Sequence, residues 1–400
     1  MIKHKQIENV SDYISSKIED INTEIFKKIG NTIKIMSTLS PSEAYQLSQI
    51  LKYGGGYEEI AQRLAKISGK NIEEIYKIFD LVAQDNKQFA KEFYRYRGVK
   101  YIPYSKDLAL QRQVRGIAQL TANTYMNIAN TKGIGFLFSD LKGQMHFKNI
   151  QQGYYEIVDR GILAISQGKS TFDTEMRRII KDLGQNGVVM YENGNTRRLD
   201  SALRMNILDG VRQLNQTTNK IFAQEYGADG IEISVHSNPA PDHEDIQGRQ
   251  FSNIEYDKLM SGDTAIDLKG NIYKPMERRY IGEYNCYHDI FYIIVGVSEP
   301  IYTDEQLQKI IDDNNKGFMY EGKHYTNYEG TQLQRQIELA IRKQKDTQVL
   351  ARSSGFKDIA EKSQKKINIL TDKYNELCNI SGLLPKKQRM SVPGYRRIKV

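Results

Sequence analysis

Three of the six histidines fall near a cysteine in the stretch from residue 231 to residue 297. Neutral imidazole and thiolate are the usual protein ligands of zinc. Cys286 and His288 are two positions apart, so in extended backbone both side chains would point to the same face. Together with His236 and His243 they predict a tetrahedral, structural zinc site. Loop histidines that hydrogen-bond to nearby acids and to the backbone are the alternative interpretation.

The acidic residues around His243 also allow an enzymatic interpretation. Asp242, Glu244 and Asp245 flank this histidine. A histidine among carboxylates can act as a general base with Cys286 as the nucleophile, and the carboxylates could instead hold the ion of a metal-dependent nuclease. The sequence has neither a GxxxxGK[ST] loop nor a GxGxxG motif, so nucleotide hydrolysis has no support. A nuclease or hydrolase centred on His243 and Cys286 is therefore kept as the alternative function.

Gly248 and Arg249 follow the acidic segment directly. Glycine is favoured where the backbone takes a conformation that other residues resist. An arginine can pair with a carboxylate and fix the shape of a loop, at modest energy where it is exposed. We predict that Gly248 supplies a turn and that Arg249 pairs with Asp242 or Asp245.

Two segments that favour β-structure must position these side chains. Residues 231–235 alternate apolar and polar side chains, which is the period of a half-buried strand, and His236 follows directly. Residues 291–297 form a continuous apolar run that is typical of a fully buried strand. A small α+β module is therefore predicted here, built against the helices that precede it.

The chain before this module is predicted to be helical. Apolar residues recur every three or four positions over residues 10–36, which predicts one apolar stripe on a long core or docking helix. Capping residues and glycines indicate the later boundaries. They are a capping box at 40–43, a break at 54–56, starts at Asn71 and near Asp107, a stop at Gly168 with Ser170 as the next cap, a stop at Gly184, a hairpin over 188–194, and a helix from Asp200 to Gly227.

The last hundred residues predict a capping box from Thr303 to Gln306, a hairpin at Glu321 and Gly322, and helices over 331–350 and 357–380. Cys378 is expected to be a packing residue on the last helix. The fold class is thus α+β and predominantly helical, with long N-terminal helices and a small mixed module in the C-terminal half. We divide the chain into a helical docking region (1–150), helices plus the His/Cys module (151–300), and a helical region with a basic end (301–400).

Composition limits the class of protein. Hydrophobic residues make up 39% and charged residues 26% of the 400 residues, which is polar but well short of a disordered composition. Two distant cysteines imply no disulfide framework, so we expect folding in a reducing cytoplasm. The start lacks the apolar core of a signal peptide, and no apolar run reaches membrane-spanning length, so no membrane association is expected.

The positive charge is concentrated at the C-terminal end. The net charge is +8, and residues 331–400 alone carry 16 Lys and Arg against 6 Asp and Glu. Such an end suits a phosphate backbone or an acidic protein surface, although a solubilising role explains it equally well. The candidate nucleic-acid contacts are Lys386, Lys387, Arg389, Arg396, Arg397 and Lys399.

The order of several short motifs resembles the minor capsid protein 2 family of tailed bacteriophages, which is related to the Mu F-like head morphogenesis proteins. The resemblance covers about residues 150–395, and the N-terminal helices more weakly. The motifs that carry it are the helix at 199–205, EISVH at 232–236, the segment from His243 through QGR to FS at 251–252, NCYH at 285–288, GVS at 296–298, and YEGTQLQRQIE at 328–338.

The resemblance implies a structural, non-enzymatic minor head protein present in few copies per virion. Such a protein would be made in the cytoplasm of the bacterial host. It is expected to associate with the portal protein and other capsid proteins at the portal vertex during head assembly, and to contact phage DNA during packaging or ejection. The family pattern runs nearly to the end of the chain, and no added toxin domain is evident.

Overall fold

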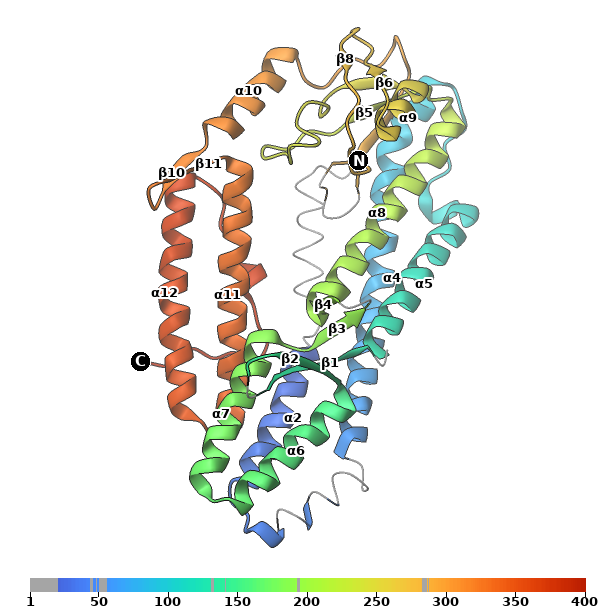
Figure 1. Cartoon of the computed structure of the whole chain (residues 1–400). Coiled ribbons are helices and arrows are strands. Elements are labelled where there is room, and N and C mark those ends of the chain that lie inside the picture. Colours follow the sequence, from blue (N-terminus) through green and yellow to red (C-terminus); the bar gives the residue numbers. More distant parts are fainter. Residues whose placement is uncertain are drawn as a thin grey trace.

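The computed structural model describes residues 21–43, 46, 47, 49, 56–130, 133–140, 142–192, 195–282, 286 and 288–400. These residues are predominantly helical with small antiparallel sheets, which confirms the predicted α+β class (Figure 1). None of the described helices combines the length and the apolarity that a membrane span requires. The α-helices are α2 (Ile21–Met36), α4 (Gly56–Tyr96), α5 (Leu108–Asn130), α6 (Ile150–Ser166), α7 (Lys169–Asn186), α8 (Leu199–Tyr226), α9 (Asn253–Ser261), α10 (Asp304–Lys316), α11 (Asn327–Ser353) and α12 (Lys357–Ser381).

The strands form four separate antiparallel sheets within the described residues. A four-stranded sheet has the order β2-β1-β3-β4, a three-stranded sheet the order β6-β5-β9, and two hairpins pair β7 with β8 and β10 with β11. Their bounds are β1 (Ile134–Ser139), β2 (Met145–Asn149), β3 (Val189–Glu192), β4 (Asn195–Arg198), β5 (Gly230–Ile233), β6 (Gln250–Ser252), β7 (Ala265–Ile266), β8 (Ile272–Tyr273), β9 (Ile290–Ile293), β10 (Phe318–Tyr320) and β11 (Lys323–Tyr325); short 3-10 helices cover Tyr104–Lys106 (η1) and Lys387–Met390 (η2).

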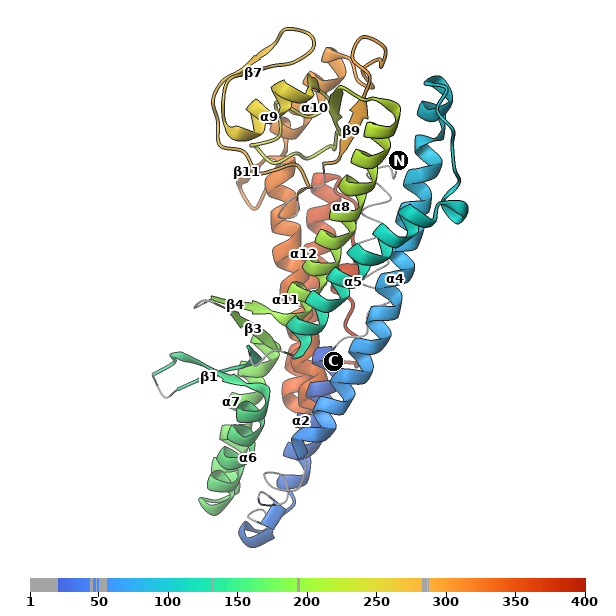
Figure 2. The ribbon, with the colours of Figure 1, turned by 90° about the vertical axis from the view of Figure 1, so that its right-hand side faces the viewer.

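The largest core lies among the helices and the four-stranded sheet. It gathers buried side chains of α2, α4, α5, α6, α7 and α8 with those at the adjoining ends of α11 and α12. Helices α4, α5 and α8 run side by side as a long arm, and α8 leads from β4 to the small β-module at the other end (Figures 1 and 2). Gly227 ends α8 in the left-handed conformation with φ 71°, as predicted, and the chain then enters β5.

Close helix packing joins α11 to this core. A Cβ on Gly30 of α2 would collide with Ser353, and a Cβ on Gly184 of α7 would collide with Thr347. Beside these contacts, Arg198 pairs with the buried Asp346 at 2.6 Å. The main core therefore contains residues from each of the regions 1–150, 151–300 and 301–400, and the division of the chain at those boundaries stays a prediction.

Tertiary contacts also explain why some predicted helix boundaries were wrong. Asn71 does not start a helix: it lies inside the continuous α4, and its buried amide donates to the hydroxyl of Tyr125 at 2.6 Å. Gly184 lies inside α7 and does not end it. A Cβ at this position would collide with Thr347 of α11, so the glycine serves helix packing. The caps predicted at Ser170 and Asp200 are each the second residue of their helix, and Gly168 and Arg198 stand at the N-cap positions. Residues 10–20, 54, 55, 193 and 194, which entered other predictions, lie outside the described residues.

The β-module has its own small core beneath the three-stranded sheet. Strand β5 is central, between β6 and β9, and all four of its residues are buried. The prediction of a half-buried strand was therefore wrong, since Glu232 on its polar face is also covered and accepts hydrogen bonds from Gln250 and Ile301. The buried strand predicted over residues 291–297 was wrong in extent and in burial, because β9 ends at Ile293 and is an edge strand that is only partly buried.

The third core lies between α11 and α12. Both predicted helices are confirmed, as are the capping box at Thr303 and Gln306 and the hairpin at Glu321 and Gly322. The segment that follows α12 packs against these helices, because Met390 and Val392 are buried and Lys345 donates to the carbonyl of Met390 at 2.7 Å. It then reaches α2, where the hydroxyl of Thr23 donates to the carbonyl of Pro393 at 2.8 Å.

Candidate metal centre

The structure brings together three of the four side chains that the sequence predicts as zinc ligands. His243 lies in the loop between β5 and β6, and Cys286 and His288 lie just before β9. All three residues are buried, and their ligand atoms lie within 4.8 Å of one another. The Sγ of Cys286 is 3.4 Å from the Nδ1 of His243 and 3.4 Å from the Nδ1 of His288.

A backbone carbonyl fixes the tautomer of His243. Its Nε2 lies 2.7 Å from the carbonyl oxygen of Arg279, and a carbonyl can only accept, so Nε2 carries the proton. The Nδ1 that faces Cys286 therefore presents a lone pair. Burial lowers the pKa of His243, although the bond to Arg279 opposes that effect, so the ring is held in the neutral form that a metal binds.

Gln247 fixes the tautomer of His288 in the same way. The backbone N–H of His236 donates to Oε1 of Gln247 at 3.1 Å, which identifies that atom as the oxygen. The Nε2 of His288 lies 3.2 Å from the same oxygen and must donate to it. The Nδ1 of His288 therefore also directs a lone pair toward Cys286.

The surroundings of Cys286 keep its sulfur in the protonated form while no cation is near. Burial raises the pKa of the thiol, against hydrogen bonds from the backbone at Gly282 and His288 that lower it. The backbone N–H of His288 reaches Sγ at 3.4 Å. A thiol has one proton and can donate to only one of two nitrogens, whereas a metal cation binds a thiolate and two lone pairs together.

This donor set fits zinc in composition and in spacing. Zn–S bonds of about 2.3 Å and Zn–N bonds of about 2.05 Å at tetrahedral angles separate sulfur from nitrogen by about 3.6 Å. The two observed separations of 3.4 Å are close to that value. Each imidazole also donates its other N–H to an oxygen, which is the usual outer partner of a zinc-bound histidine.

The fourth predicted ligand, His236, lies beside the cluster without joining it. Its ring packs against the ring of His288 with centroids 4.3 Å apart. It is half-buried, whereas the other three are buried. The described part of the chain thus places three ligands together, with His236 next to them.

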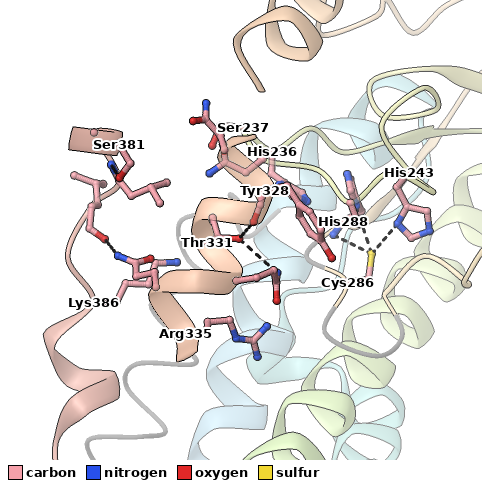
Figure 3. A pocket seen from close by; sticks show the side chains of 18 of the residues that line it. His236, Ser237, His243, Cys286, His288, Tyr328, Thr331, Arg335, Ser381 and Lys386 are labelled. Carbon is pink, nitrogen blue, oxygen red and sulfur yellow. Dashed lines mark hydrogen bonds between the residues drawn. The ribbon is translucent and has the colours of Figure 1, made fainter. Parts of the chain in front are cut away.

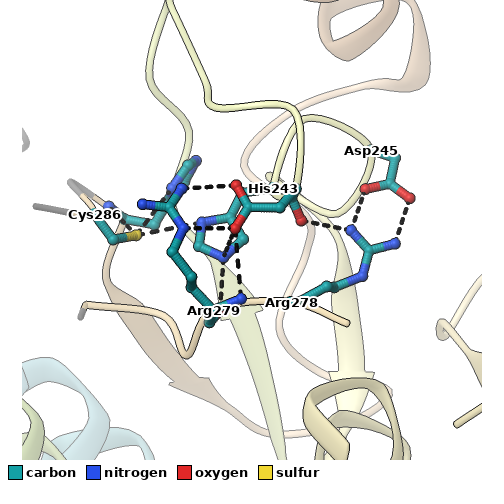
Figure 4. Close-up of polar contacts among 7 residues, drawn as sticks. His243, Asp245, Arg278, Arg279 and Cys286 are labelled. Atoms are coloured by element: carbon teal, nitrogen blue, oxygen red, sulfur yellow. Dashed lines mark hydrogen bonds and ion pairs between the residues drawn. The ribbon is translucent and has the colours of Figure 1, made fainter. Parts of the chain in front are cut away.

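Two arginines that the sequence interpretation overlooked hold the loop of His243 in place (Figure 4). Arg278 binds both carboxylate oxygens of Asp245, at 2.6 and 2.7 Å. Arg279 binds both oxygens of Asp242, at 2.7 Å each. Burial would raise the pKa of Asp242, but the Arg279 hydrogen bonds and nearby positive charges outweigh it and lower that pKa. The adjacent arginines and the two acids of the loop were the sequence signal that could have shown this pairing.

The prediction for Arg249 was wrong in its partner. Arg249 pairs with Asp304 at the start of α10, because Asp242 and Asp245 are already engaged. Gly248 has the predicted turn conformation, with φ 70°. A Cβ there would also lie 2.8 Å from Cγ2 of Val235 and would collide with Leu307. Both the backbone conformation and the lack of space therefore favour glycine at this position.

The metal cluster forms one end of a cavity of about 520 Å³ between the β-module and the C-terminal helices (Figure 3). His236, His243, Cys286 and His288 line it from the module. Ser237, Asn238, Ala240 and Arg279 of the module also line it. The remaining lining residues belong to the start of α11, the end of α12 and the segment after α12. These residues are Asn327, Tyr328, Thr331, Gln332, Gln334, Arg335, Ser381, Gly382, Leu383, Leu384, Lys386 and Arg389.

The sequence matches the family described as Phage minor capsid protein 2 over residues 2–379, nearly its whole length. This chain belongs to the phage minor capsid protein 2 family. The match confirms the family resemblance and makes the chain a structural capsid protein of a bacteriophage. No curated protein and no solved structure gives a significant match.

The six basic residues that were predicted to contact nucleic acid in this minor capsid protein differ in their exposure to solvent. Lys387, Arg396, Arg397 and Lys399 are exposed at the surface. Lys386 and Arg389 are half-buried and line the cavity instead. The basic end is packed against α11, α12 and α2, with four of these six cations exposed and two lining the cavity.

Proposed function

We propose that this minor capsid protein associates with the portal vertex during head assembly and there contacts the packaged DNA. Membership of a capsid family carries the structural part of the proposal. The helical arm supplies a docking surface, and the exposed basic residues supply a DNA contact.

The outer face of the arm has the character of a docking surface. Leu81, Phe89 and Tyr96 of α4 are exposed, at 56%, 42% and 64%, and their spacing places them on one side of the helix. Val99, Ile102 and Leu108, in and beyond the connection to α5, are also exposed. Apolar side chains gathered on one surface indicate a site of protein association.

Mass spectrometry of purified procapsids and mature virions tests the location of the protein. We expect the protein in both particles, and copurification of the portal protein with it from infected cells. Its absence from both particles would overturn the proposal. Particles assembled without the portal protein are the matched control, since they should lack this chain and retain the major capsid protein.

We further propose that His243, Cys286 and His288 hold a zinc ion with a structural role. The two fixed tautomers and the sulfur–nitrogen separations support it. A bound zinc would tie the β5–β6 loop to the start of β9 and so stabilise the module. Metal analysis of the full-length protein tests this proposal, and about one zinc per chain is expected. A protein that is purified without zinc, and whose thermal stability added zinc leaves unchanged, would contradict it.

The geometry gives the nuclease or hydrolase hypothesis less support. No Asp or Glu is among the described residues that line the cavity, so a carboxylate base is missing from that lining. Asp242 and Asp245, which would have held a catalytic ion, are bound to arginines. Cleavage of DNA by the purified protein, abolished by His243→Ala, would nevertheless establish the enzymatic alternative.

A further inference from the structure

We infer that the end of the helical arm beside the β-module binds single-stranded nucleic acid. The inference goes beyond the proposed function, which assigns the DNA contact to the C-terminal basic end, and it does not depend on that contact. Two independent observations carry it: the charge of residues 91–106, and an open groove beside them that aromatic side chains line.

Residues 91–106, which comprise the last turns of α4 and most of the connection to α5, are strongly basic. They contain five Lys and Arg against one acid, and five aromatic residues are interspersed among them. Cations that alternate with aromatic side chains are typical of surfaces that bind a single strand through its phosphates and its bases. All five cations are exposed, and they are Lys91, Arg95, Arg97, Lys100 and Lys106.

The connection is folded back against α4, which gathers these cations at one end of the arm (Figure 2). The backbone N–H of Val99 donates to the carbonyl of Tyr94 at 3.0 Å, and the ring of Tyr101 packs edge-on against Tyr94 with centroids 5.7 Å apart. Further along, the hydroxyl of Tyr104 donates to the carboxylate of Asp80 at 2.6 Å. The three cations of the connection therefore lie alongside the helix that carries the other two.

Ion pairs offset this positive charge only in part. Glu92 pairs with Arg95 at 3.4 Å, and both side chains are largely exposed, so this pair is weak. Asp107, the next acid along the chain, is bound to the buried Lys87 at 3.2 Å. Arg97 donates to a backbone carbonyl at the end of α8 at 3.1 Å, a contact that orients the guanidinium and leaves its charge in place. The end of the arm therefore carries positive charge that phosphates can neutralise.

A groove of about 560 Å³ lies between the end of α4 and the turn after β9. Tyr96, which lines it, is 64% exposed, and Phe93 is held by stacking on Tyr226 with ring centroids 5.1 Å apart. An aromatic and apolar groove of this size, with an arginine at its rim, fits a base and the phosphate next to it. The lining residues are Glu92, Phe93, Arg95, Tyr96, Ile294, Val297 and Ser298.

The combination of cations and aromatic groove favours a single strand over a duplex. A duplex keeps its bases stacked inside and would use the cations alone, whereas an unpaired strand can also stack a base on an exposed ring. The exposed Glu299 follows the groove residue Ser298, so the phosphates are expected on the α4 side. Tyr96 also belongs to the face proposed above for portal docking, and the portal protein is therefore the alternative occupant that the experiment must separate.

Fluorescence anisotropy of a labelled oligothymidylate of about 20 nucleotides, longer than most single-strand sites, tests the charge of the surface. The full-length protein is titrated at several salt concentrations. Replacing Lys91, Lys100 and Lys106 with Gln should reduce the logarithmic salt slope by about 0.7 for each phosphate that is no longer neutralised. Lys357, Lys365 and Lys366, exposed on α12, give the matched triple Gln control, which should keep the parent slope.

Tyr96 tests the groove in the same assay. Tyr96→Ala should weaken binding roughly 5- to 100-fold, the usual loss for a base stacked on an aromatic ring, and Tyr96→Phe should retain it. Tyr280→Ala is the matched control, because that ring is 54% exposed on the β-module away from the groove lining, and it should have no effect.

Four results would overturn the inference. They are no binding of the oligonucleotide by the parent protein, equal slopes in the two triple variants, parent affinity in Tyr96→Ala, and a duplex bound as tightly as the single strand. Loss of portal binding in Tyr96→Ala without loss of the oligonucleotide would assign the groove to the portal protein. A strand held by the basic end alone would lose its salt dependence when Arg396, Arg397 and Lys399 are replaced and keep it in the arm variant, which would leave the proposed function standing and this inference rejected.

Discussion

The β-module and the helical arm use polar side chains in opposite ways. In the module Gln247 orients His288 beside Cys286, and the side chains of Arg278 and Arg279 bind the acids on either side of His243. In the arm the polar groups Asn86, Lys87 and Asn215 are buried between helices, while apolar side chains such as Leu81 face outward. This difference supports the proposals that the module holds a metal ion and that the arm meets another protein.

The largest effect is expected on zinc affinity, and it should differ between the two cysteines. Cys286→Ala should weaken zinc binding by more than about 100-fold, since removing a group that only orients a ligand already costs about 10–100-fold. Chelators should then lower the melting temperature of the parent protein and leave that of the variant unchanged. Cys378→Ala, in the α11–α12 core, is the control: it should lower stability and keep the zinc. Equal zinc content in all three proteins would contradict the site.

Gln247 tests whether the module positions its ligands through outer partners. Gln247→Leu removes the oxygen that accepts from His288 and His236, so zinc affinity should fall about 10–100-fold. Gln250→Leu is the matched control, because that buried amide binds Glu232 instead. Competition with a zinc indicator gives both affinities, and equal losses in the two variants would show that Gln247 acts only through stability.

The arm should show binding effects without stability effects. Leu81→Asp together with Phe89→Asp should weaken portal binding roughly 30-fold or more, which is the usual loss at a central interface residue. The free energy of unfolding should change by less than about 0.5 kcal/mol per site, since both side chains are exposed. Ile369→Asp on α12, exposed at 59%, is the control and should bind the portal normally. Unchanged portal affinity in the double variant would place the docking surface elsewhere.

The smallest effect is expected at the basic end. Replacing Arg396, Arg397 and Lys399 with Gln should reduce the salt dependence of DNA binding, by about 0.9 in the logarithmic slope for each phosphate that the variant no longer neutralises. Substitution is preferable to deletion, because Met390 and Val392 are part of the packed core. Lys365→Gln with Lys366→Gln, exposed on α12, is the control. An identical slope in both variants would mean that the basic end makes no specific DNA contact.

The sequence predicted what depends on neighbours along the chain. The Thr303 capping box, the hairpin at Glu321 and Gly322 and the left-handed Gly227 all follow from contacts within a few residues. Gly184 was misjudged because its role depends on Thr347, which is far away in sequence.

The candidate site divides in the same way. Residue types and local spacing suggested His243, Cys286 and His288, but the positioning residues and the cavity could not be predicted. Arg335 and Lys386 join the site only because α11 and the segment after α12 pack beside the module. The exposed or buried state of each basic residue likewise depends on that packing and not on the charge pattern.

The contact between α2 and the segment around Pro393 bears on the order of events in the cell. The hydrogen bond from Thr23 to Pro393 spans 370 positions, and Gly30 packs on Ser353 of α11. A ribosome releases α2 long before it makes either partner. The main core therefore closes only after synthesis has passed α11, and a chain cut short before that point leaves the apolar side of α2 uncovered. Only a chain that includes α11 can therefore present the complete main core.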